Sequence, residues 1–135
     1  MDYERLIQIR ENGNHFTHEM GIQTEEMREG YARVKLPVEK KHMNFLGSVH
    51  GGCLFSMADT VAGAASASYG NYSTTVDASI HYLAPAIDVR ELIGEAKVIK
   101  HGKRISVYQV EIRSEKGKLL AMGEFTYYDM GKKIE

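Results

Sequence analysis

The sequence predicts an α+β fold in which one long central helix is wrapped by a curved antiparallel β-sheet. A run of small and apolar residues without proline follows His50 and continues to about Tyr69. A helix that is small or apolar on nearly every side is expected to be enclosed by the rest of the protein. Most of the remaining chain alternates apolar and polar residues in segments joined by short turns, which is typical of antiparallel strands.

The composition predicts one soluble domain over residues 1–135. This length is near the common size of a single domain, and 43% hydrophobic with 26% charged residues is ordinary for a globular protein. A net charge of −1 gives no reason to expect a nucleic-acid partner. Cys53 is the only cysteine, and neither a signal peptide nor an apolar run long enough to span a membrane is apparent. We therefore expect a cytoplasmic protein without a membrane partner.

Before the central helix, the pattern predicts one short helix and two strands. Residues 2–11 mix apolar and charged side chains as a short helix does, and an Asn-Gly-Asn sequence ends it. Residues 16–21 are predicted as a short first strand, so residues 1–28 would hold the N-terminal helix and this strand. Residues 31–38 are predicted as a clear strand whose alternate side chains face the core. These core-facing residues are Ala32, Val34, Leu36 and Val38.

After the central helix, we predict four strands at residues 74–83, 91–100, 104–114 and 118–128. Short turns join them, so the sequence predicts a four-stranded antiparallel meander. A single helix covers only one face of a sheet, and the other face of these strands is predicted to keep several apolar side chains. They are Ile93, Ile99, Val110, Ile112, Leu120 and Met122. Because such a face is too apolar for open water, we expect partner chains to cover it in a homo-oligomer.

Asp59 is the first candidate for a catalytic role, because it is a single carboxylate within the apolar run. On a helix it shares one stripe with Ser56, Gly63 and Ser66. This stripe could simply face water, or Asp59 could accept hydrogen bonds at an interface. Alternatively, the carboxylate could act as a general base or as a nucleophile in a partly dry site.

The sequence His50-Gly51-Gly52 comes at the start of the helix. The glycines could serve only a crowded turn, but the first N–H groups of a helix also lack internal partners and can stabilise a developing oxyanion. Gly51 and Asp59 are eight residues apart, about 12 Å along a helix, so one small carbonyl group could hardly contact both. If both act on one substrate, they must come from different chains, as a two-fold dimer would allow.

Three further residues have roles that the sequence leaves open. Asn44 could orient the His-Gly-Gly corner or an attacking water, or be an ordinary loop residue, and Thr75 could be an ordinary strand residue. Cys53 could be a nucleophile, because a thiol in the first turn of a helix can have a depressed pKa, but a lone cysteine is more often a small buried residue. The histidines show no ligand spacing, so we expect no metal site.

The residues around the start of the helix resemble one family, the hotdog-fold thioesterases of the phenylacetic-acid-degradation (PaaI-like) type. The matching pattern is Asn44, Gly47, His50-Gly51-Gly52, and Asp59 followed by Ala62 and Gly63, then Thr75-Val76-Asp77 and Tyr82-Leu83-Ala84-Pro85. The likeness covers about residues 30–128. It implies a hotdog fold, dimers paired into tetramers, and hydrolysis of acyl-CoA thioesters. Coenzyme A would then be part of the substrate, and no separate cofactor would be needed.

The resemblance also implies roles for the candidate residues. Asp59 would be the nucleophile or the general base that acts on water, and the N–H of Gly51 would polarise the thioester carbonyl. His50 and Asn44 would shape that corner of the site. Thr75 lies where the family often has a serine or threonine that helps to position the water.

Coenzyme A is anionic and would need cationic groups near the mouth of the site. Lys103 and Arg104 are candidates for contacts with its phosphates, although a solvated turn explains them equally well. Two other functions remain open at this point. One is a hotdog dehydratase or hydratase acting on acyl thioesters, which needs a histidine and a carboxylate acting together. The other is a non-catalytic module that binds acyl-CoA.

Overall fold

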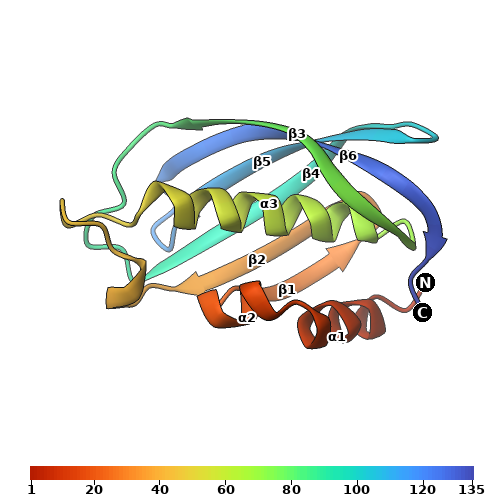
Figure 1. The fold of residues 1–135 in the computed structure, drawn as a ribbon. Coiled ribbons are helices and arrows are strands. Elements are labelled where there is room, and N and C mark those ends of the chain that lie inside the picture. The colour runs from red at the N-terminus through yellow and green to blue at the C-terminus, as the bar shows by residue number, and fades with distance from the viewer.

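One long helix, α3 (Gly51–Ala67), lies across one face of a curved six-stranded antiparallel sheet (Figure 1). A computed structural model describes all of residues 1–135. Most residues of α3 are buried, as expected for a helix with small or apolar side chains on nearly every side. The predicted enclosed central helix is therefore confirmed. No helix of the chain is both long enough and apolar enough to cross a bilayer.

The sheet contains the strand predicted at residues 31–38 and the four strands predicted after the helix, in an order that the sequence did not predict. The strands are β1 (Gln23–Arg28), β2 (Tyr31–Pro37), β3 (Asn71–Tyr82), β4 (Glu91–His101), β5 (Ile105–Ser114) and β6 (Leu119–Lys133). Their order across the sheet is β1-β2-β4-β5-β6-β3. The expectation that β3 begins a meander is therefore wrong, because β3 crosses to the far edge and pairs with β6. Alternation of side chains shows which residues face the core, but it does not identify the neighbouring strand.

The core lies between α3 and the inward face of the sheet. Ala32, Val34 and Leu36 of β2 are fully buried there, which confirms the predicted facing of that strand. Three of the six apolar residues predicted for the outward face instead belong to this core, namely Val110, Ile112 and Leu120. The cross-strand pairs show the reason for the first two, since Val110 and Ile112 lie opposite inward-facing residues of β4. Only Ile93, Ile99 and Met122 remain partly or fully exposed.

The N-terminal segment differs from its prediction at one place. Helix α1 (Tyr3–Gly13) forms as expected, and the Asp2 side chain caps it by accepting the N–H of Arg5 at 3.1 Å. Residues 16–21, predicted as a strand, fall instead in and just after a second helix, α2 (His15–Met20), which ends at Gly21 with φ of +85°. The first strand is β1, whose sequence is too charged to suggest a strand by itself. Both segments have six residues, a length at which local pattern decides poorly between helix and strand.

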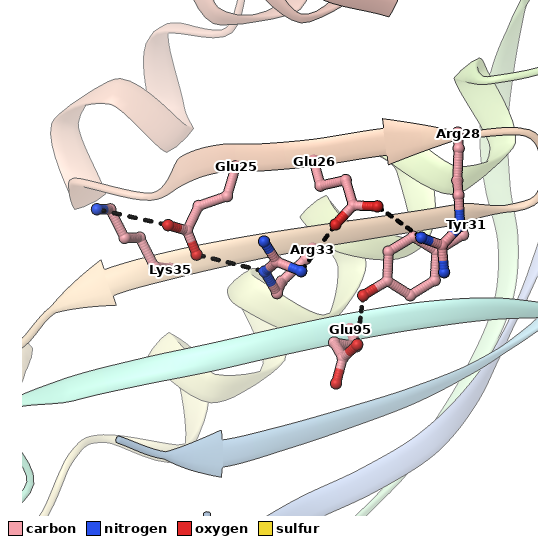
Figure 2. Close-up of polar contacts among 7 residues, drawn as sticks. All are labelled: Glu25, Glu26, Arg28, Tyr31, Arg33, Lys35 and Glu95. Carbon is pink, nitrogen blue, oxygen red and sulfur yellow. Dashed lines mark hydrogen bonds and ion pairs between the residues drawn. The ribbon is translucent and has the colours of Figure 1, made fainter. Parts of the chain in front are cut away.

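The outward side of β1, β2 and β4 carries a set of polar contacts that we call the outer polar cluster (Figure 2). Its members are Glu25, Glu26, Arg28, Tyr31, Arg33, Lys35 and Glu95. Arg33 bridges the first two, with Nη1 2.8 Å from Glu26 and Nε 3.5 Å from Glu25. The Tyr31 hydroxyl donates a hydrogen bond to Glu95. These contacts join the three strands on the face that points away from α3.

Candidate active site

A hollow with a volume of about 570 Å³ lies between α1, α2, α3 and the start of β3. Apolar and polar side chains both line it, including Phe16, Phe55 and Tyr72 on one hand and Ser56 and Thr74 on the other. The stripe of α3 that contains Asp59 forms one wall. The predicted stripe therefore borders a cavity of a size suited to a small ligand.

The carboxylate of Asp59 is held on one oxygen only. Oδ1 accepts hydrogen bonds from Thr75 Oγ1 at 2.7 Å and from the Tyr127 hydroxyl at 2.6 Å. No hydrogen bond within the chain reaches Oδ2. Thr75, a candidate from the sequence, thus contacts Asp59 directly from β3. The arrangement fixes the orientation of the carboxylate and leaves one oxygen free for chemistry.

Tyr127 of β6 is a functional candidate that the sequence did not suggest. Burial raises the pKa of its phenol, and the neighbouring carboxylate of Asp59 raises that pKa further. The phenol therefore stays protonated and donates to Asp59, whose backbone carbonyl also lies 2.7 Å from the hydroxyl oxygen. Tyr127 lies 68 residues after Asp59, and no local motif connects the two.

The His-Gly-Gly corner begins α3 as predicted. His50 caps the helix, because its Nδ1 accepts the N–H of Gly52 at 2.8 Å and its carbonyl accepts the N–H of Cys53 at 2.9 Å. The N–H of Gly51 has no partner within the chain. This group lines a second hollow of about 330 Å³, where the Tyr82 hydroxyl donates to the Gly51 carbonyl at 3.0 Å. The corner thus offers one free N–H at the positive end of a helix.

Asn44 holds the loop that leads to this corner. Its side-chain carbonyl accepts the N–H groups of Leu46 at 2.9 Å and Ser48 at 3.1 Å, and its amide donates to Ser48 Oγ at 2.9 Å. The N–H of His50 then donates to the carbonyl of His42 at 2.8 Å. Asn44 therefore fixes the shape of the approach to the corner through the loop backbone.

One chain does not bring all the candidate residues together. Asp59 and Thr75 line the larger hollow, whereas Gly51 lines the smaller one. Lys103 and Arg104 line neither, because they lie in the turn between β4 and β5. This turn lies near the end of α3 rather than its start (Figure 1), where His101 stacks on Tyr69 with ring centroids 3.6 Å apart.

Cys53 is not suited to act as a nucleophile. Its side chain is buried under the first turn of α3, and this burial raises the pKa of the thiol to about 11. The thiol is therefore almost entirely neutral at physiological pH, whereas nucleophilic attack requires the thiolate. The burial of Cys53 therefore gives no support to the alternative of a cysteine nucleophile.

Comparison with known proteins now adds to this geometry. The family model described as the thioesterase superfamily matches residues 46–121, which include α3, β3, β4, β5 and the start of β6. The chain belongs to the thioesterase superfamily. Acyl-coenzyme A thioesterase PaaI of Escherichia coli is 35% identical over 103 residues, covering 76% of this chain and 74% of its own length. Acyl-coenzyme A thioesterase 13 of Mus musculus is 32% identical over 95 residues, covering 68% of each chain.

Solved structures agree with this assignment. The structure of E. coli PaaI, from the phenylacetic acid degradation operon, superposes with a TM-score of 0.90 at 29% identity, covering 98% of this chain and 97% of that one. A hypothetical thioesterase from Streptococcus pneumoniae, solved with coenzyme A, gives a TM-score of 0.83 at 26% identity, covering 92% and 99%. The chain is therefore a PaaI-like thioester hydrolase with the hotdog fold, as the resemblance in its sequence implied.

Proposed function

We propose that this thioesterase hydrolyses acyl-CoA to the free acid and coenzyme A, with Asp59 as the general base or the nucleophile. The observation that carries the proposal is the asymmetric hydrogen bonding of the Asp59 carboxylate. Thr75 and Tyr127 hold Oδ1, and Oδ2 remains free beside a cavity large enough for an acyl group. The names of two relatives as acyl-coenzyme A thioesterases, and the coenzyme A in a structural neighbour, support the same substrate class.

The chemistry follows from these positions. As a base, Oδ2 of Asp59 takes a proton from water while the water oxygen attacks the thioester carbonyl carbon. The carbonyl oxygen becomes an oxyanion, and the free N–H of Gly51 stabilises it, an interaction worth about 3 kcal/mol for comparable donors. The C–S bond then breaks, the thiolate leaves and takes up a proton, and the acid is released. As a nucleophile, Oδ2 attacks the same carbon, the C–S bond breaks and the thiolate leaves, and water then hydrolyses the resulting anhydride to the free acid and the Asp59 carboxylate. Either route uses water as the only co-substrate and needs no cofactor.

The proposed site is shared between two chains. Gly51 and Asp59 line different hollows of one chain and lie about 12 Å apart along α3. Strand β3 is an edge of the sheet with an unpaired outer side, and Val76 and Tyr82 on it are each about half exposed. A second copy that pairs along β3 would place the Gly51 corner of one chain near Asp59 of the other. We therefore propose a homodimer, and dimers assembled into tetramers, as the active form in the cytoplasm.

The remaining candidates have supporting roles in this proposal. His50 caps α3 at the Gly51 corner, and we propose that its ring approaches the thiol leaving group. Asn44 fixes the loop that precedes this corner. Lys103 and Arg104 are proposed to contact the phosphates of a coenzyme A bound mainly by another chain of the oligomer, because within their own chain they line neither hollow.

The test is release of free thiol from a panel of acyl-CoAs with short, medium, long and aryl acyl groups. Wild type is compared with Asp59→Asn and with Glu95→Gln, which changes a carboxylate on the outer face. We expect release by wild type and Glu95→Gln and almost none by Asp59→Asn. Full activity in Asp59→Asn would overturn the mechanism. Hydration of an enoyl-CoA without thiol release would instead indicate a hydratase, and binding without any reaction would indicate a binding module.

A further inference from the structure

Strand β3 contacts both parts of the proposed site within one chain. Near its start, Thr75 donates to Asp59 Oδ1 at 2.7 Å. At its end, the Tyr82 hydroxyl donates to the carbonyl of Gly51 at 3.0 Å. The Tyr82 ring also packs against Gly51, because a Cβ on that glycine would lie 3.4 Å from Cζ of the ring. The catalytic steps above give Tyr82 no role, yet it holds the residue whose N–H is the proposed oxyanion donor.

A bulge in β3 turns both of these side chains toward α3. Thr75 and Tyr82 are seven residues apart, and in a regular strand this odd spacing would place them on opposite faces of the sheet. However, Thr75 and Asp77 pair with adjacent residues of β6, so Val76 between them has no partner there. The extra residue restores a common face. Thr75 and Tyr82 accordingly lie opposite residues of β6 that are buried in the core.

The free edge of β3 limits how a second copy can pair with it. This strand is the last of the sheet, so its outer N–H and C=O groups have no partner strand. Two copies related by a two-fold axis pair antiparallel there, and residues directly opposite each other face the same side of the sheet. The axis must therefore pass through a residue of β3 rather than between two residues. With the bulge counted, only an axis at Ser79 places Thr75 of one copy opposite Tyr82 of the other.

Charge complementarity supports the same register. An axis at Ser79 places Asp77 opposite the partner's His81, and symmetry repeats this pair on the other side of the axis. Both residues are exposed in the single chain, and neither side chain has a hydrogen-bond partner there. A carboxylate opposite an imidazole N–H forms a favourable cross-strand pair. An axis at Asp77 would instead set two carboxylates against each other, which is unfavourable.

We propose that two copies of this chain pair along β3 about an axis at Ser79. In this arrangement Tyr82 is a positioning residue that holds the Gly51 corner beside the partner's Asp59. The inference rests on the proposed function, in which Gly51 and Asp59 of different chains act on one substrate. The Tyr82 that supports Gly51 then lies next to the Thr75 that supports the partner's Asp59. The bulge in β3 thereby aligns the two halves of each shared site.

The first test is disulfide formation between copies, which does not depend on turnover. Ser79→Cys places two thiols at the axis, where opposed Cα atoms are about 4.5–5.5 Å apart and can form a disulfide. Asp77→Cys is the matched control, because its two copies are displaced by four residues, about 13 Å along the strand. The native Cys53 is buried, and wild type controls for it. Under mild oxidation we expect a covalent dimer from Ser79→Cys and none from Asp77→Cys.

A double variant keeps this test decisive if a disulfide at the axis is strained. Asp77→Cys combined with His81→Cys should form two disulfides between copies, whereas His81→Cys alone should form none. A covalent dimer from neither Ser79→Cys nor the double variant would overturn the register, and so would one from Asp77→Cys alone. Cross-linking at Ser79 in a protein that releases no thiol would support the register and reject the proposed function. Thiol release without cross-linking would reject the register and leave the proposed function standing.

The second test separates the role of Tyr82 from that of the strand. Tyr82→Phe removes only the hydroxyl, and Tyr128→Phe removes an exposed hydroxyl from β6 as a control. We expect Tyr82→Phe to lower kcat by about 2–10-fold with little change in KM, the effect of one neutral hydrogen bond. It should still cross-link when combined with Ser79→Cys, and Tyr128→Phe should match wild type. An unchanged kcat in Tyr82→Phe, or an equal loss in Tyr128→Phe, would overturn the role of Tyr82.

Discussion

The protein contains two tyrosine–carboxylate pairs with the same chemistry in different surroundings. On the outward face, Tyr31 donates to Glu95 within the outer polar cluster, and in the cavity Tyr127 donates to Asp59. Each pair lies near an arginine, since Arg28 stacks 3.8 Å over the Tyr31 ring and Arg10 of α1 lies with the Tyr127 hydroxyl over Gly63. The types of residue therefore do not distinguish the catalytic candidate from the structural pair.

The surroundings of the two pairs distinguish them, since the phenols of both are buried to the same degree. The charged side chains that form ion pairs in the outer polar cluster are between 30% and 59% exposed, so solvent and salt screen their interactions. Burial raises the pKa of both phenols, but that of Tyr127 much further than that of Tyr31. Both carboxylates leave one oxygen without a partner in the chain, but only Asp59 and Tyr127 border the cavity. The comparison teaches that here function follows from a position beside a cavity rather than from the pairing itself.

The largest expected effect is on catalysis, when each carboxylate in turn is neutralised. Asp59→Asn should lower kcat/KM for the best acyl-CoA by about 10²–10⁴-fold, the usual contribution of a general base. Glu95→Gln should leave kcat/KM unchanged, because its carboxylate lies on the far side of the sheet. Steady-state thiol release measures both. Comparable losses in the two variants would remove the distinction between the pairs.

The next largest effect concerns the two hydroxyl donors. Tyr127→Phe removes a hydrogen bond to a charged group, worth about 1.5–3 kcal/mol, and should lower kcat/KM by about 10–100-fold. Tyr31→Phe should leave activity within about twofold of wild type. Tyr108→Phe is a further control, because Tyr108 packs against Tyr127 and its buried hydroxyl makes no hydrogen bond. If Tyr108→Phe lowers activity as much as Tyr127→Phe, packing rather than the hydrogen bond explains the loss.

A smaller effect is expected on stability at alkaline pH. Both phenols have pKa values above the ordinary value of 10.0 in the folded protein, so the folded state holds these protons more tightly than the unfolded chain does. This contribution is complete below pH 10 and is lost as the pH rises further. Tyr127→Phe should therefore remove more of the alkaline loss of stability than Tyr31→Phe. Denaturant unfolding near neutral pH and above pH 10 checks this, and equal pH dependence in the two variants would contradict it.

The smallest effect is expected within the outer polar cluster. Arg33→Gln breaks the contacts with Glu25 and Glu26 and should lower the free energy of unfolding by at most about 1 kcal/mol per pair. The difference from wild type should shrink in high salt, because salt screens exposed charges. Thermal and denaturant unfolding at two ionic strengths measure it. A loss of thiol release in Arg33→Gln would show that the outward face also affects the site.

The sequence predicted those parts of the molecule that depend on local pattern. Helix α3, its start at the His-Gly-Gly corner and the inward face of β2 all follow from neighbouring residues. Residues 16–21 and β1 do not follow from neighbouring residues. A six-residue segment is too short for its hydrophobic pattern to distinguish a helix from a strand, so contacts with other segments decide its structure. The position of β3 beside β6 likewise depends on pairing between distant segments.

The residues of the candidate site also fall into two groups, those that a local pattern identifies and those that only the fold brings together. Asp59 and Gly51 could be identified because they lie on one helix in a recognisable arrangement, and Thr75 because it lies near the start of the strand predicted after that helix. Tyr127 and Arg10 could not, since each is an ordinary residue in its own segment. Only the folded chain brings them over Gly63, where the missing side chain leaves room for both.

Some of the side chains near Asp59 lie outside the segment that the family model matches, and this has an evolutionary consequence. The segment that matches the thioesterase superfamily covers residues 46–121, so it contains Asp59 and Thr75 but neither Arg10 nor Tyr127. Substitutions at those two outer positions can change the charge and the hydrogen bonding around the carboxylate without altering the motif of the helix. Relatives with the same motif can therefore differ in the contacts that hold this carboxylate.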